Sequence, residues 1–132
     1  MKPKINGIHH IALKANGSAA YEKTLAFYRD LLGLPTVREW GEGDGRGAML
    51  DTGAGMLEIF ASAPCEPSVG AIRHMALSVE SADACIEAVR AAGYLVTVEP
   101  KDIVIPSDPP YPARIAFCIG PVGEEVEFFE ER

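Results

Sequence analysis

Two histidines and two glutamates lie at matching places in the two halves of the sequence. His10 begins the segment His-Ile-Ala-Leu, and His74 begins His-Met-Ala-Leu about half of the 132-residue chain later. Glu58 and Glu127 follow these histidines in the same order, each inside an apolar segment. Imidazole nitrogen and carboxylate oxygen both bind zinc, nickel and iron, and carboxylates also bind manganese. The repeat therefore predicts one divalent metal ion held by His10, Glu58, His74 and Glu127.

Side-chain alternation along the predicted strands places these four residues on the sheet face opposite the large apolar residues. Neighbouring residues of a strand point to opposite faces of a sheet. In both histidine segments the large apolar residues share one face, and the histidine shares the other with smaller residues. The glutamates likewise alternate with large apolar residues: Leu57, Ile59, Val126 and Phe128. We expect the apolar face to meet a helix and the histidines and glutamates to line a concave surface.

Each of these residues also has an ordinary structural interpretation. A single histidine on a strand is more often hydrogen-bonded than metal-bound, and a glutamate of an edge strand usually faces solvent. The match between the two halves favours the metal site. His9 is a competing ligand beside His10, but alternation places it on the helix-facing side, so we rank it lower.

A helix is predicted after each histidine segment. Apolar residues recur at helical spacing over 18–32 and over 81–92. Ser18 and Ser81 are suitable N-cap residues, with Glu22 and Asp83 placing negative charge near the positive helix ends. Gly33 and Gly93 follow as helix-ending glycines.

Short strands follow each helix, so the chain is predicted to be α+β and to repeat one βαβββ module, over 1–64 and 70–132. The predicted strands are 36–40, 47–51 and 55–61, then 95–99, 113–119 and 124–130. Five prolines in 100–112 predict a long loop there, with at most a short extended piece at 103–105. Two modules with curved mixed sheets would together enclose a cleft.

Composition excludes several other classes of protein. Twelve Lys and Arg against 19 Asp and Glu give a formal charge of −7, which disfavours nucleic acid as a partner. No apolar run is long enough to span a bilayer, and the first residues lack the apolar region of a signal peptide. Three widely spaced cysteines predict reduced thiols rather than disulfides. We therefore expect a cytoplasmic protein without a membrane partner.

The segments His-Ile-Ala-Leu at 10–13, Phe-Tyr-Arg-Asp-Leu-Leu-Gly-Leu at 27–34 and Met-Leu-Glu-Ile-Phe at 56–60 resemble the vicinal oxygen chelate superfamily. The second half, with Arg-His-Met-Ala-Leu-Ser-Val at 73–79 and Gly-Pro-Val-Gly-Glu-Glu-Val-Glu at 120–127, resembles it too. The resemblance covers nearly the whole chain. It implies a single domain over 1–132, built of paired modules around a cleft.

Within this superfamily, the set of two histidines and two glutamates is most similar to that of glyoxalase I. The resemblance implies a metal-dependent lyase or isomerase that forms an enediolate from a small oxygenated substrate. Zinc or nickel would be the first metals to test, then iron, manganese and cobalt. Glu127 would move the proton, with Glu58 as its mirror partner. The superfamily also implies a homodimer, and the site could close within one chain or across two.

Other members of the superfamily supply the alternatives. Methylmalonyl-CoA epimerase commonly has glutamine at the position of Glu58, and the bleomycin-binding proteins are metal-free small-molecule binders. Glyoxalase I would place an arginine near Lys14 and an asparagine near Ser62 to hold glutathione, and this chain departs from it at both. Lys14, Arg38, Arg114 and the 100–112 segment are candidates to contact an anionic substrate, although solvent-exposed charge is the simpler role.

Overall fold

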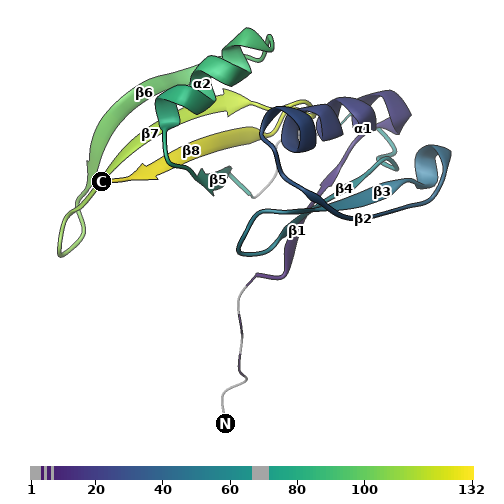
Figure 1. The fold of residues 1–132 in the computed structure, drawn as a ribbon, viewed down its shortest axis with the longest axis horizontal. Coiled ribbons are helices and arrows are strands. Elements are labelled where there is room, and N and C mark those ends of the chain that lie inside the picture. The colour runs from purple at the N-terminus through teal and green to yellow at the C-terminus, as the bar shows by residue number, and fades with distance from the viewer. Residues whose placement is uncertain (1–3, 5, 7, 67–71) are drawn as a thin grey trace. The chain divides into compact units, whose positions relative to one another are not determined.

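The chain folds as two compact units, residues 1–67 and 68–132 (Figure 1). The structure, a computed structural model, describes residues 4, 6, 8–66 and 72–132. Among these residues, no helix is long and apolar enough to cross a membrane.

The two units have the same order of elements, which confirms the α+β class and the repeated βαβββ module. The first contains β1 (His10–Lys14), α1 (Gly17–Leu25), the π-helical turn η1 (Ala26–Leu31), β2 (Thr36–Trp40), the 3-10 turn η2 (Gly43–Gly45), β3 (Gly47–Asp51) and β4 (Met56–Phe60). The second contains β5 (Met75–Ser78), α2 (Ala82–Ala91), β6 (Val96–Ile105), β7 (Tyr111–Ile119) and β8 (Glu125–Glu131). We call these two units module 1 and module 2.

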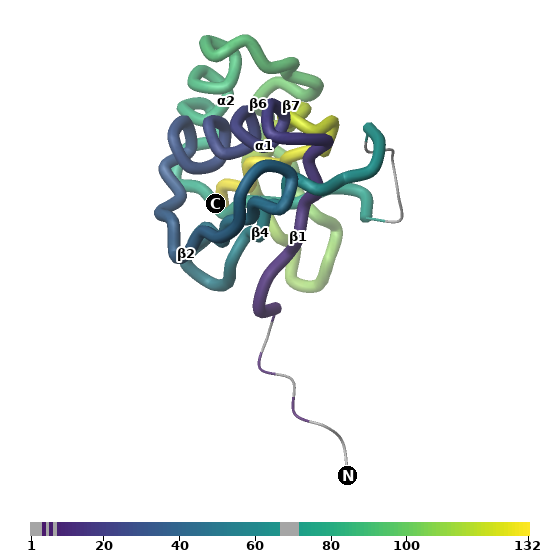
Figure 2. The backbone as a smooth tube through the Cα atoms, turned by 90° about the vertical axis from the view of Figure 1, so that its right-hand side faces the viewer, coloured from purple at the N-terminus to yellow at the C-terminus, as the bar shows by residue number. Residues whose placement is uncertain are grey.

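Each module forms one mixed four-stranded sheet. The strand order is β1-β4-β3-β2 in module 1 and β5-β8-β7-β6 in module 2. The first strand of each module pairs in parallel with the last, and the other pairs are antiparallel. In module 1, α1 lies over one face of the sheet (Figures 1 and 2). The opposite face is therefore available for the candidate ligands.

Helix α2 begins as predicted, whereas α1 does not. The Ser81 hydroxyl accepts a hydrogen bond from the amide of Ala84 at 3.1 Å, which confirms it as the N-cap. Helix α1 starts at Gly17, with Asn16 at the N-cap position and no side-chain cap, so Ser18 is already helical. Glu22 lies outside the first turn and pairs with Arg46 instead. A small residue before a helical pattern is thus an ambiguous start signal.

The end of the first predicted helix is a π-helical turn. The amide of Leu32 bonds to the carbonyl of Phe27 at 2.9 Å, one residue wider than in an α-helix. Gly33 and Gly93 follow the two helices with φ of 78° and 90°, which confirms the predicted glycine ends.

The predicted long loop over 100–112 is wrong. Strand β6 continues from Val96 to Ile105 and pairs with β7 as an antiparallel hairpin. Pro100 fits because β6 is an edge strand and its register with β7 shifts between Val98 and Lys101, where a missing amide breaks no regular ladder. The hairpin extends beyond the end of β8 (Figure 1).

The core of each module is the apolar face of its sheet together with the buried side of its helix. The apolar neighbours of the candidate glutamates (Leu57, Ile59, Val126 and Phe128) are at most 1% exposed, as the alternation predicts. Ile11 differs from these buried residues. Alternation along the strand predicts that it packs against the helix, but it is 41% exposed. The reason lies in the sheet order, since β1 is an edge strand and β4 lies inside it.

Candidate metal centre

His10 and Glu58 lie together on β1 and β4 of module 1. Glu58 is directly opposite Ala12 in the parallel pairing, and His10 precedes Ala12 by two residues on the same face. The His10 Nε2 atom lies 3.5 Å from Glu58 Oε1. Because Ala12 has a small side chain, the Glu58 carboxylate has room to reach along the strand toward the imidazole.

His74 and Glu127 repeat this arrangement in module 2. Glu127 is opposite Ala76 across the β5–β8 pairing, and His74 again precedes that alanine by two residues. His74 Nε2 lies 2.9 Å from Glu127 Oε2. The edge of the His74 ring also packs against Phe117 of β7, with centroids 5.2 Å apart. The two modules therefore build the same histidine–glutamate pair from matching sequence positions, with His10 as the first residue of β1 and His74 directly before β5.

The two carboxylates are unusual in their burial. Glu58 is 9% exposed and Glu127 is 8% exposed, and in the described residues neither forms an ion pair with lysine or arginine. A buried carboxylate without a cationic partner is costly, so such groups usually meet a positive charge or a metal ion. The His74 Nδ1 atom is also buried without a hydrogen-bond partner among the described residues. These donors fit a divalent cation, because imidazole nitrogen and carboxylate oxygen are among its preferred ligands.

Each module supplies only two of the four predicted ligands. The described residues contain no group of three or more His, Cys, Asp or Glu side chains placed to hold a metal ion. A stable divalent centre generally has three or four protein ligands. The described residues of one module therefore do not form such a centre by themselves.

His9 does not lie on the helix-facing side of the sheet, where alternation predicted it. It is exposed and does not join the helix-facing apolar side chains. Its Nδ1 atom lies 2.9 Å from His10 Nδ1, and the two rings meet edge to face with centroids 5.2 Å apart. One of these nitrogen atoms must donate and the other accept. If His10 donates, its Nε2 atom keeps a free lone pair toward Glu58. The adjacency of the two histidines was the only sequence signal for this contact.

The three basic residues suggested for an anionic substrate have different surroundings. Arg114 binds both carboxylate oxygens of Asp83, at 2.6 and 3.0 Å, and also Asp102 at 3.2 Å. These bonds keep the pKa of Asp83 below its usual value. Arg114 is thus paired to helix α2, away from the face that carries Glu127. Lys14 and Arg38 lie on the same face of module 1 as His10.

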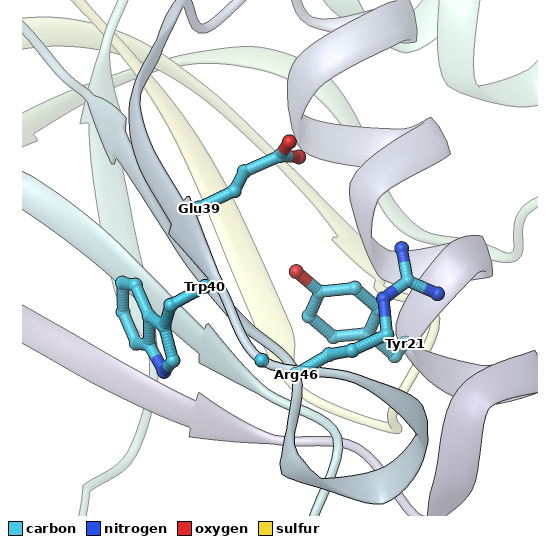
Figure 3. Close-up of a pocket in the computed structure, with 5 residues that line it drawn as sticks. Tyr21, Glu39, Trp40 and Arg46 are labelled. Atoms are coloured by element: carbon cyan, nitrogen blue, oxygen red, sulfur yellow. The ribbon is translucent and has the colours of Figure 1, made fainter.

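A separate pocket of about 280 Å³ lies in module 1 between α1 and the end of β2. It is lined by Tyr21, Glu39, Trp40, Gly41 and Arg46 (Figure 3). The Arg46 guanidinium lies 4.6 Å from the centre of the Tyr21 ring and pairs with Glu22, and Glu39 pairs with Arg29 at 3.4 Å. These charges are already paired, and neither His10 nor Glu58 lines the pocket, so it is separate from the candidate metal ligands.

The cysteines agree with the prediction of reduced thiols. Cys65 is exposed, Cys85 half-buried and Cys118 buried, and all three are free. Burial raises the pKa of the Cys118 thiol to about 12, so this group is protonated at neutral pH and a poor nucleophile.

Comparison with known proteins identifies the class of protein that this fold and these residues define. The sequence profile of the Glyoxalase/Bleomycin resistance protein/Dioxygenase superfamily matches residues 7–128. The chain belongs to this superfamily. The resemblance seen in its motifs is therefore confirmed.

Individual proteins that resemble this chain have low sequence identity to it. The uncharacterized protein YwkD of Bacillus subtilis is 27% identical over 96% of this chain and 98% of its own length. The trypanothione-dependent glyoxalase I of Leishmania major is 18% identical, with a TM-score of 0.68 over 92% of this chain and 84% of that one. TnmS3, an antibiotic binding protein from Streptomyces sp. CB03234, is 20% identical, with a TM-score of 0.68 over 98% of this chain and all of that one. At identities this low, the two solved structures show only that this chain has the same fold. Because one of them is a glyoxalase I and the other an antibiotic binding protein, the fold does not distinguish an enzyme from a binding protein.

Proposed function

We propose that this protein is a divalent-metal-dependent lyase or isomerase of the glyoxalase type, acting on a small oxygenated substrate. The observation that carries the proposal is the repeated pair of a histidine and a buried glutamate, at 3.5 Å in module 1 and 2.9 Å in module 2. His10, Glu58, His74 and Glu127 would hold the metal ion. When bound, a divalent cation would polarise two neighbouring substrate oxygens and stabilise the negative charge of an enediolate.

The proton transfer is assigned to Glu127, with Glu58 as its counterpart. A carboxylate can take a proton from the carbon next to a carbonyl and return it to the neighbouring carbon. Burial suits this role, because low exposure to water keeps the proton from exchanging with solvent. Both glutamates meet this condition, at 9% and 8% exposed for Glu58 and Glu127.

The substrate of such an enzyme need not contain glutathione. Lys14 stands where the resemblance implies an arginine, and lysine lacks the planar fork that binds a carboxylate through two bonds. Ser62 stands where asparagine is implied, and its backbone forms an isolated bridge with Asn16. We propose a cytoplasmic homodimer that uses another thiol or a substrate without one.

The test is metal analysis of protein purified without chelators, followed by hemithioacetal isomerisation assays with several thiols. We expect close to one metal ion per chain, and turnover that is lost with chelator and restored with zinc or nickel. Bound metal without turnover on any thiol would redirect the assay to enolising reactions such as epimerisation.

A metal-free small-molecule binding protein is the second candidate. It is favoured by the structural similarity to TnmS3, an antibiotic binding protein. Protein that contains no metal after purification, and binds none on addition of zinc or nickel, would favour this candidate and contradict the enzymatic one.

A further inference from the structure

The face of module 1 that carries His10 and Glu58 also carries two cations, Arg38 and Lys14, and neither forms an ion pair with a carboxylate of the described residues. The strand register defines a row of paired residues across the sheet. Ala12 is paired with Glu58, Glu58 with Met49, and Met49 with Arg38. Residues paired in register point to the same side of a sheet. Arg38 therefore lies on the Glu58 face, two strands away from it.

The Arg38 side chain is directed across this face by sulfur contacts. Its Nη1 atom lies 2.9 Å from Met49 Sδ and 3.9 Å from Met56 Sδ. Thioether sulfur is a weak acceptor. No carboxylate of the described residues forms an ion pair with Arg38, although the nearby Arg29 and Arg46 are both paired. The guanidinium thus retains its strong donors for an oxygen ligand.

An aromatic platform lies in the next row of the same face. Trp40 faces Gly47, which faces Phe60, and Phe60 faces Lys14. The indole occupies the space above Gly47, where a Cβ atom would lie 2.3 Å from the ring, and it meets Phe60 edge to face at 6.0 Å. Figure 3 shows this indole on the opposite side of β2 from Glu39. An apolar group could lie against Trp40 while an anionic group reaches Arg38.

Module 2 has no matching cation. In its corresponding row, Ala76 faces Glu127, Glu127 faces Phe117, and Phe117 faces Val98. The position that corresponds to Arg38 is therefore apolar. Both modules have the histidine and the glutamate, but only module 1 has an arginine at the Arg38 position. We therefore relate Arg38 to substrate binding and not to metal binding.

We propose that Arg38 binds a carboxylate group of the substrate, so that the substrate is an anion with an apolar portion lying on Trp40. The proposal rests on the proposed function for the identity of the site, and it adds the substrate class. A planar carboxylate accepts two parallel hydrogen bonds from a guanidinium, which gives both affinity and orientation. Lys14 is the other cation of this face and is the natural rival for the same role.

Trp40 is the only tryptophan in the chain, so its fluorescence reports ligands that bind beside it, and the variants below separate this face from the pocket that Trp40 also lines. We would titrate the protein with 3-phenylpropanoate and with its neutral amide, 3-phenylpropanamide, both after chelator treatment and after metal loading. We expect the carboxylate to bind about tenfold more tightly than the amide in both preparations, since a hydrogen bond to a charged group contributes about that much. Binding to chelator-treated protein separates this test from the metal-dependent function.

Four variants assign the effect to a residue. Arg38→Met should remove the preference for the carboxylate, and Arg38→Lys should restore only part of it. Arg90→Met, which removes an exposed arginine of module 2 paired with Glu99, should leave it unchanged. Circular dichroism would show that each variant is folded. The proposal is overturned if the wild-type protein does not distinguish acid from amide, or if Lys14→Met removes the preference while Arg38→Met keeps it.

Discussion

At the scale of single residues, the account depends on two glutamates that are buried although no lysine or arginine of the described part of the chain pairs with them. Glu58 and Glu127 lie among apolar strand residues, and each has an imidazole as its neighbour. Burying a carboxylate costs free energy unless a cation or hydrogen-bond donor compensates it. Their retention in both modules is therefore best explained by chemistry and not by packing.

The roles of the two glutamates can be separated by isosteric substitution. At saturating metal, Glu127→Gln should lower kcat by about a hundredfold or more, because an amide cannot accept the proton. Glu58→Gln should weaken metal binding and reduce kcat less, since an amide oxygen remains a possible ligand. Turnover and metal content would be measured on the same samples. Equal losses of kcat at equal metal content would contradict the assignment to Glu127.

His9 provides a second prediction at this scale. Its 2.9 Å contact with His10 Nδ1 orients the His10 ring, and partners of metal-binding histidines usually affect affinity. We expect His9→Ala to weaken metal binding about tenfold without removing it, whereas His10→Ala should remove it. Calorimetric titration with zinc would compare the two. An unchanged affinity in His9→Ala would show that the contact does not support the site.

At the scale of secondary-structure elements, local sequence signals predicted which residues share a face better than they predicted where elements end. Alternation placed Glu58 and Glu127 correctly between buried neighbours, because a period of two is a direct consequence of strand geometry. Ser81 was identified as an N-cap for a similarly local reason. Ser18 and the 100–112 segment were not predicted correctly, since the start of α1 and the pairing of β6 with β7 depend on contacts between elements.

Arg114 links helix α2 to the sheet of module 2 and gives a prediction about stability. Its guanidinium binds Asp83 through two bonds and also contacts Asp102. Arg114→Met should lower the Tm by roughly 2–4 °C at pH 7, and Arg114→Lys should recover part of the loss. The matched control is Arg90→Met, which breaks a more exposed pair and should change the Tm less.

The same ion pair should show a defined pH dependence. Arg114 lowers the pKa of Asp83 in the folded state. A carboxyl group with a lowered pKa contributes stability above its unfolded pKa of about 3.9, and this contribution is lost as the pH falls below that value. The Tm difference between wild type and Arg114→Met should therefore be full at pH 7 and shrink below about pH 4. A difference that is constant from pH 7 to pH 2.5 would show that Asp83 is not the partner that matters.

At the scale of the whole molecule, duplication explains why one chain contains the same two-residue unit twice. The sequence was sufficient to recognise the repeat, the superfamily and the strand positions of all four candidate ligands. It could not predict how the two pairs combine, because that depends on packing between modules or between chains, where no local periodicity applies. For the same reason the expected cleft and the homodimer remain predictions.

The most direct test of the central claim is the metal content of variants that alter one module at a time. Wild-type protein, His10→Ala and His74→Ala would be loaded with zinc, freed of excess metal by gel filtration and analysed by mass spectrometry. If both modules bind one shared cation, the wild type should retain about one zinc ion per chain, and either substitution alone should remove nearly all of it. Wild-type protein that retains no zinc, or a variant that keeps its full zinc content, would contradict the account.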